Sequence, residues 1–222
     1  MRNTTRPTND RAGRAAGRVV QGAAAAVLLG MLWVTLDAAA VERQVQLAYH
    51  RAERDVGLDR APPPAEAAPR AALAYALING RRAAELPAGA QQARYLAAGW
   101  KYLDVAAAAR RPGWGEIDVA DTFLRTVEHG AGSREARDSY RRSYRNAPFL
   151  VAQSIWRIRF GSEAWASIDE PSRRMMLAEA AWAGSQSGWQ YALVRSIIGR
   201  RGERLQRFRG ASAAHMAERG DR

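Results

Sequence analysis

Hydrophobic and polar positions in this chain recur with the spacing of α-helices. No segment alternates apolar and polar residues with the β-branched enrichment of a strand. Clusters rich in glycine, proline and serine separate the helical patterns. The predicted helices lie at about 70–79, 90–110, 117–129, 133–145, 148–160, 171–185 and 188–200. We therefore expect an all-α fold.

Local signals place some of the helix starts and faces. Ser187 and Gln190 have capping-box spacing, and Asp169 before Pro171 has the position of an N-cap. The helix predicted at 148–160 is apolar on two sides, which favours a place at the centre of the domain. Its polar side is predicted from Gln153, Ser154 and Arg157. Short helices joined by short turns predict antiparallel pairs, stacked as a helical-hairpin, α-solenoid or TPR-like domain.

Residues 19–36 form an uncharged apolar run, which would be about 27 Å long as a helix and so long enough for a bilayer core. The preceding segment has five arginines against one aspartate, whereas residues 37–60 have five acids against four arginines. The positive-inside rule then predicts a cytoplasmic N-terminus and a periplasmic C-terminal part in the bacterial inner membrane.

The run also has two other interpretations. Ala38-Ala39-Ala40 satisfies the rule for signal-peptide cleavage, and a buried helix of a soluble protein is a third reading. An uncleaved anchor is favoured, because the helical pattern continues past the run to Val56. Gly22, Ala26 and Gly30 form a small-residue face that could join two anchors in a homodimer, although an Ala-rich composition also produces such spacing.

Composition shifts divide the chain into successive segments. Pro62, Pro63 and Pro64 interrupt the helical pattern and favour an extended spacer. The predicted segments are a basic cytoplasmic segment at 1–18, the anchor at 19–36, a helical stalk at 37–59, a Pro/Ala linker at 60–69, a helical domain at 70–200 and a basic, disordered tail at 201–222.

The amino-acid composition limits which kinds of catalytic and metal-binding site this chain can contain. The net charge is +12, but almost all of the basic residues are arginine and alanine is abundant, which is typical of GC-rich coding sequences and weakens the case for nucleic acid. The absence of cysteine excludes disulfides, thiolate metal sites and cysteine catalysis. The three histidines are far apart in sequence. We expect no cofactor, no metal and no catalytic residue.

Two groups of residues are candidate sites. Arg134, Arg137, Arg141 and Arg145 fall within about 80° on one helix and form an Arg stripe, with Tyr140 and Tyr144 on the buried side. The Arg stripe could contact an acidic glycan, a lipid headgroup or an acidic envelope protein, or it could be an ordinary solvated face. Glu116, Asp118, Asp121 and His129 form the nearest approach to an enzyme site, but acids in the first turn of a helix need no catalytic explanation.

One stretch carries a resemblance. Residues 146–182 read NAPFLVAQSIWRIRFGSEAWASIDEPSRRMMLAEAAW. The Pro-started helix ending in Arg-Phe-Gly, followed by Trp, Ile-Asp, paired arginines and Trp, resembles small membrane-anchored, TPR-like helical proteins of alphaproteobacterial exopolysaccharide or O-antigen regions. The resemblance implies a non-enzymatic scaffold in envelope polysaccharide assembly or export. The alternative is a cytoplasmic, Arg-rich helical protein that binds nucleic acid.

Overall fold

The computed structural model describes the backbone of residues 10–53, 61–109, 114–199 and 203–220. Side chains are described from Val27 onward within these ranges, except at 28, 51–53, 203, 219 and 220. Every element in these ranges is helical, which confirms the all-α prediction. The elements are α1 (Asp10–Glu53), the 3₁₀ turn η2 (Pro64–Glu66), α2 (Pro69–Glu85), α3 (Ala90–Ala108), α4 (Glu116–His129), α5 (Arg134–Asn146), α6 (Ser154–Glu163), α7 (Glu170–Gly184), α8 (Gly188–Ile198) and α9 (Glu203–Gly220).

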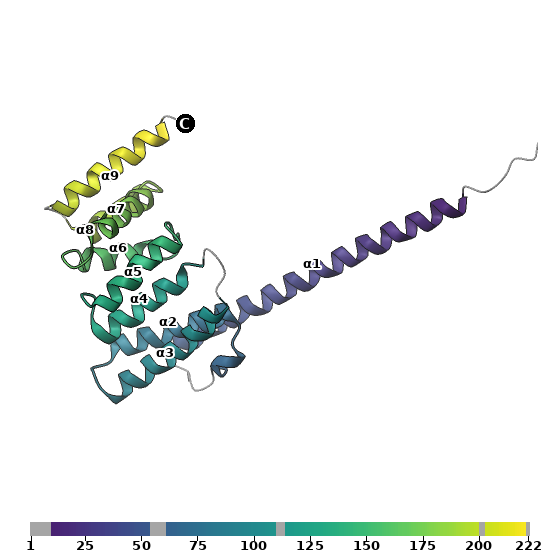
Figure 1. The fold of residues 1–222 in the computed structure, drawn as a ribbon, viewed down its shortest axis with the longest axis horizontal. Coiled ribbons are helices and arrows are strands. Elements are labelled where there is room, and N and C mark those ends of the chain that lie inside the picture. The colour runs from purple at the N-terminus through teal and green to yellow at the C-terminus, as the bar shows by residue number, and fades with distance from the viewer. Residues whose placement is uncertain (1–9, 54–60, 110–113, 200–202, 221–222) are drawn as a thin grey trace, which may run out of the picture.

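The helices from α2 to α5 pack in chain order, as do those from α6 to α9, and α5 contacts α7. One end of the long α1 packs on α2, and the rest of α1 projects away from this body (Figure 1). One apolar core lies among α2, α3 and α4, where small side chains such as Ala72, Ala76 and Ala106 are fully buried. A second core lies among α5 to α9 and has larger members, including Tyr140, Met176 and Phe208. A small cluster of Val119, Ala147 and Leu150, with Trp156 packed on it, lies between the two cores.

Capping groups set several helix ends, as the sequence predicts. The Ser187 hydroxyl accepts from the Gln190 amide at 3.2 Å, and the Asp169 carboxylate accepts from the Ser172 amide at 2.9 Å. Gly130 and Gly199 follow α4 and α8 with φ of 87° and 102°, a conformation that side chains other than glycine rarely adopt. These local signals explain why the predicted boundaries of α7 and α8 are close to the observed ones.

The predicted helix at 148–160 is wrong in its first half, because α6 begins only at Ser154. The backbone before it is held by side chains instead: the Leu150 amide donates to the Glu179 carboxylate, and Arg157 donates to the carbonyls of Ala147 and Pro148. Arg157, predicted on the polar side, is fully buried.

The helix predicted to end at residue 79 continues through Gly80 to Glu85. Gly80 lies inside α2, where a Cβ atom would come within 2.7 Å of the Leu124 side chain. The glycine therefore allows the close approach of α2 and α4.

The linker prediction also differs from the structure over residues 61–69, because Tyr102 of α3 donates to the Pro62 carbonyl at 2.6 Å and Ala67 is buried. This segment lies against the body rather than extending as a spacer.

The basic tail is not disordered over residues 203–220, which form α9. Leu205 and Phe208 are buried among α7 and α8, and Phe208 contacts the Tyr191 ring at 5.6 Å between centroids. Two tail arginines are bound to the same body: Arg204 to the Ser162 carbonyl and Arg207 to Glu170. Leu205 and Phe208 lie between the arginines and three positions apart, so they fall on the same face of a helix and give α9 an apolar side to bury.

The predicted anchor lies on α1, which is one unbroken helix through Glu53. No helix in the described part of the chain is long and apolar enough to cross a membrane. Much of the predicted span lies outside that part, since the side chains of 19–26 and 28 are not described. The side chain of Ala26 and the surroundings of Gly22, in the proposed dimer face, also lie outside it, while a Cβ built on Gly30 would meet no described atom within 4 Å beyond the adjoining backbone of α1.

Candidate functional site

The Arg stripe lies on α5, where Tyr140 and Tyr144 are buried as predicted. Three of its arginines are bound within the protein. Arg137 donates to the Ser167 carbonyl at 2.6 Å, Arg141 contacts Asp138 and, at 3.3 Å, Asp169, and Arg134 is 3.6 Å from Asp138. Arg145 is exposed.

A pocket of about 270 Å³ lies beside these arginines, between α5 and the start of α7. Its lining contains Asp138 and Asp169 together with Arg134, Arg137 and Arg141. The two carboxylates compensate much of the positive charge, so the pocket has little to attract an anion. The geometry therefore favours a role for the stripe in tying α5 to the segment before α7, and a contact with an acidic partner stays a prediction.

Asp169 has two tasks in this pocket, as the N-cap of α7 and as a partner of Arg141. Partial burial acts to raise its pKa, but hydrogen bonds from Ser172 and the charges of Arg141 and Arg137 outweigh burial and hold the pKa below its usual value. A carboxyl with a lowered folded-state pKa stabilises the fold above its unfolded-state pKa, near 3.9, and loses that contribution as the pH falls through the folded-state value.

We expect Asp169→Ala to cost about 1 kcal/mol of folding free energy at pH 7, because the α7 N-cap is lost. The difference from the parent chain should shrink below about pH 4, where Asp169 becomes protonated. Urea unfolding at a series of pH values measures both effects. Asp169→Asn is the matched control, because asparagine also caps helices; it should be milder than alanine. A cost from Asp169→Ala that is the same at pH 7 and pH 3 would contradict the assignment.

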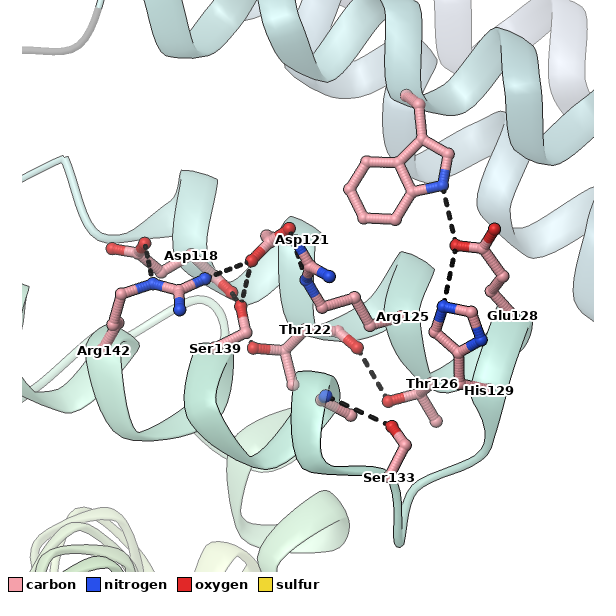
Figure 2. A network of polar contacts seen from close by, with 12 residues as sticks. Asp118, Asp121, Thr122, Arg125, Thr126, Glu128, His129, Ser133, Ser139 and Arg142 are labelled. Atoms are coloured by element: carbon pink, nitrogen blue, oxygen red, sulfur yellow. Dashed lines mark hydrogen bonds and ion pairs between the residues drawn. The ribbon is translucent and has the colours of Figure 1, made fainter.

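The acidic residues of α4 form a network of polar contacts with α5, shown in Figure 2. The Asp121 carboxylate accepts from Arg125 at 3.0 Å, from Arg142 at 2.6 Å and from the Ser139 hydroxyl. Asp118 accepts from Asn146 at 2.6 Å and lies 3.9 Å from Arg142. These contacts join the two helices.

This network lacks the arrangement of a catalytic site. The Ser139 hydroxyl is fully buried, so a substrate could not reach it. His129 lies at the far end of α4, where it is 3.5 Å from Glu128, whose carboxylate accepts from the Trp100 indole at 3.1 Å (Figure 2). No base therefore lies next to a free nucleophile in this cluster, and the structural interpretation of these acids is the better one.

A buried ion pair, which the sequence analysis missed, lies between α6 and α7. The Arg157 guanidinium donates to both carboxylate oxygens of Glu179, and neither side chain has any exposed surface. Tyr144 donates to the same carboxylate at 2.8 Å, and the Arg157 guanidinium carbon lies 4.1 Å from the centre of the Tyr144 ring. Burial raises the pKa of Tyr144 well above its usual value, so this phenol stays a donor. Each member has a structural partner, and a catalytic role would need solvent access.

A groove of about 400 Å³ lies along α2. Its lining is mostly apolar and comes from α1, α2, α4 and the segment that leads into α6. The residues are Val45, Tyr49, Arg70, Leu73, Ala74, Leu77, Arg81, Trp114, Glu116, Val119, Phe123, Ala152, Gln153 and Trp156. Burial raises the pKa of Tyr49, in agreement with an apolar wall. This volume is in the range of small-molecule sites.

A sequence signal for the groove exists. Arg70, Leu73, Ala74, Leu77 and Arg81 follow the i, i+3, i+4, i+7, i+11 spacing of one helix face. An apolar stripe with an arginine at each end is therefore readable on α2. Trp114, which lies just before α4, is in the same groove. No sequence signal indicates that α1, α4 and α6 leave this apolar face of α2 partly uncovered.

Other features add no further candidate. In the part of the chain that the structure describes, no three His, Asp or Glu side chains are grouped to hold a metal. Comparison with family models, curated proteins and solved structures gives no match to this chain. The resemblance to exopolysaccharide-region proteins therefore stays a prediction.

Proposed function

We propose that this chain is a non-enzymatic, membrane-anchored scaffold whose stacked, TPR-like helical body is held at the inner membrane by α1. The observation that carries the proposal is the uncovered apolar surface of α1. Leu29, Leu32 and Trp33 are 66%, 54% and 76% exposed among the residues that the structure describes. Apolar surface of this extent is unusual on a protein in water and is expected where lipid or another protein covers it.

Two further features support this proposal. The basic segment 1–18 precedes the apolar run, which favours a cytoplasmic N-terminus and a periplasmic body. The carboxylates of Asp118, Asp121 and Glu179 are engaged in contacts between helices, as expected for a scaffold. A role in envelope polysaccharide assembly rests on the resemblance of residues 146–182 alone. Binding of nucleic acid is the competing proposal, and internal pairing within the Arg stripe weakens it.

Alkaline extraction of membranes tests the anchor. We expect the full-length chain to remain in the membrane pellet at high pH and Leu29→Arg/Leu32→Arg to leave it, because each arginine near the centre of a span costs about 2.5–3.5 kcal/mol. Gln44→Arg/Leu47→Arg adds the same charges at the same spacing outside the run and should stay in the pellet.

Two results would contradict the proposal. One is a parent chain that is fully extracted at high pH, particularly if it then binds DNA with a steep salt dependence. The other is a mature N-terminus at Val41, which would identify 19–36 as a cleaved signal peptide. A periplasmic reporter fused after Gly199 tests the orientation separately and should be active.

A further inference from the structure

The exposed large hydrophobic side chains of the body come from three separate segments. Outside the apolar run, those among the described residues are Leu47 and Tyr49 on α1 and Phe149, Val151, Trp189 and Met216 on the body. The four on the body belong to the stretch before α6, to the start of α8 and to α9. Single apolar side chains are ordinary on a protein surface, so the question is whether these four lie together.

Contacts between helix ends define the end of the body at which α1 enters. The start of α2 lies there, because Arg70 is 3.5 Å from Glu42 of α1. The start of α4 lies beside the start of α2, since Trp114 and Arg70 line the same groove. The stretch before α6 adjoins the start of α4, because a Cβ atom built on Gly115 would overlap the Ala147 side chain.

The same end of the body continues through α7, α8 and α9. Phe149 contacts the ring of Trp182, near the end of α7, at 5.8 Å between centroids. Ser185, in the turn into α8, is 3.3 Å from the ring of His215 on α9. The C-terminal end of α9 is on the side of the body from which α1 projects (Figure 1). We call this end the α1-side surface, defined by Arg70 and residues 114–116, 147–152, 182–189 and 215–216.

The exposed apolar side chains are confined to the α1-side surface. Trp189 is the second residue of α8, and Met216 follows directly after the α9 histidine, so both belong to it with the stretch before α6. The opposite end of the body, where α2, α4 and α6 end, has no exposed large hydrophobic among its described residues. Its Trp165 ring is covered by the guanidinium groups of Arg173 and Arg207, at 5.2 and 5.6 Å from the ring centre.

The buried ion pair holds the stretch before α6 in this exposed position. The Leu150 amide donates to Glu179 at 3.2 Å, and Arg157 donates to two backbone carbonyls of the same stretch. Leu150 is buried, whereas its neighbours Phe149 and Val151 are 53% and 77% exposed. The exposure of these two side chains is therefore imposed by a fixed backbone.

The length of α1 places the α1-side surface close to the end of the apolar run. Leu36 ends the run, and Glu42, which contacts Arg70, lies six residues further on. Six residues of unbroken helix span about 9 Å. The headgroup layer on each side of a bilayer is about 5–8 Å deep. With the run in the hydrocarbon core, a straight helix of this length leaves the body next to the headgroups.

We propose that the α1-side surface rests on the membrane that α1 enters, with Phe149, Val151, Trp189 and Met216 inserted among the lipid headgroups. The proposal rests on the proposed anchor and adds that the body itself binds lipid. Tryptophan favours the headgroup layer, and apolar side chains gain from burial at its boundary with the acyl chains. Contacts from three segments hold the body at one tilt, with its opposite end directed away from the membrane.

Quenching of site-specific labels on the full-length chain in phosphatidylcholine vesicles tests the proposal. Because the chain has no cysteine, single cysteines can carry an NBD fluorophore without removal of native thiols. The quencher is a lipid with a nitroxide next to its headgroup. Labels at Val151→Cys and Met216→Cys should be quenched several-fold more than labels at Ala88→Cys and Ala166→Cys, which are exposed positions at the opposite end.

Charge variants test whether the apolar side chains are responsible. Val151→Asp/Trp189→Asp should reduce quenching of the Met216→Cys label several-fold, because a carboxylate resists transfer out of water. Ala88→Asp/Ala166→Asp adds the same charge at the opposite end and should leave the quenching unchanged. All of these positions are exposed, and circular dichroism must show that each variant keeps the helix content and melting temperature of the parent.

A label at Leu32→Cys, inside the apolar run, separates this proposal from the anchor. Quenching of the Leu32 label without a difference between the two ends of the body would overturn the lipid contact and leave the anchor in place. An unquenched Leu32 label would overturn the anchor and, with it, this proposal.

Two further results would overturn the lipid contact alone. One is quenching at the Met216 label that Val151→Asp/Trp189→Asp leaves unchanged. The other is a Met216 label shielded from aqueous iodide but not quenched by the nitroxide lipid, with shielding that is lost as lipid is added in excess. That result would assign the α1-side surface to a second copy of the chain.

Discussion

Glu179→Leu is expected to cost about 3–5 kcal/mol of folding free energy. The substitution leaves the fully buried Arg157 guanidinium without its counter-charge. It also removes the acceptor of the Tyr144 hydroxyl and of the Leu150 amide, which fixes the segment before α6. Urea unfolding of the full-length chain, followed by circular dichroism, measures the loss.

A double-mutant cycle measures the interaction free energy between Arg157 and Glu179 apart from the cost of losing either side chain. Arg157→Met should be about as damaging as Glu179→Leu, because it leaves a buried carboxylate, whereas the double variant should lose clearly less than the sum of the two. Glu163→Gln, an exposed acid on α6, is the control and should be nearly neutral. Strict additivity of the two substitutions would mean that the pair is not coupled as its geometry indicates.

Phe208→Ala is expected to release α9 from the body. The ring is fully buried against Tyr191 and close to Gly184, and truncations of buried phenylalanine cost about 3–5 kcal/mol. Because α9 is the last helix of the stack, the loss should appear mainly as local opening. Amide hydrogen exchange in 203–220 and tryptic cleavage at Arg204, Arg207 and Arg209 should both become faster, while exchange in α2 to α4 stays the same.

Arg209→Ala is the matched control for this prediction, since Arg209 is exposed on the same helix. It removes one cleavage site but should not change hydrogen exchange elsewhere in α9. Unchanged exchange and cleavage in Phe208→Ala would show that this ring does not hold α9 on the body. The prediction of a disordered tail would then stand again.

Sequence reasoning succeeds here where the deciding interaction is local. Ser187 and Asp169 form their caps with residues three positions away, so the starts of α7 and α8 are readable. It fails where a distant residue decides the outcome. Arg157 is polar by type, and only the position of Glu179 on the next helix allows it to be buried. Gly80 is a helix breaker by propensity, and only the approach of Leu124 gives it a place inside α2.

The same distinction applies to the candidate site. The Arg stripe is correctly placed on one face of α5, but Ser167 and Asp169, which bind two of its members, come from a later segment. The floor of the groove is a local pattern on α2, whereas its walls depend on how four segments pack. The charge pattern of a single helix is therefore a poor guide to which arginines remain available to a ligand.

The two cores differ in the size of their side chains, and this difference determines which mutations each half of the body can tolerate. Alanine and glycine at the α2–α3–α4 contacts leave few atoms to remove, so substitutions there do harm chiefly by adding volume. The tyrosines, Met176 and Phe208 of the second core have the opposite sensitivity, because truncation leaves cavities. Under random mutagenesis, the first half should reject enlargements such as Ala72→Leu while accepting exchanges among small residues. The second half should reject reductions such as Met176→Ala.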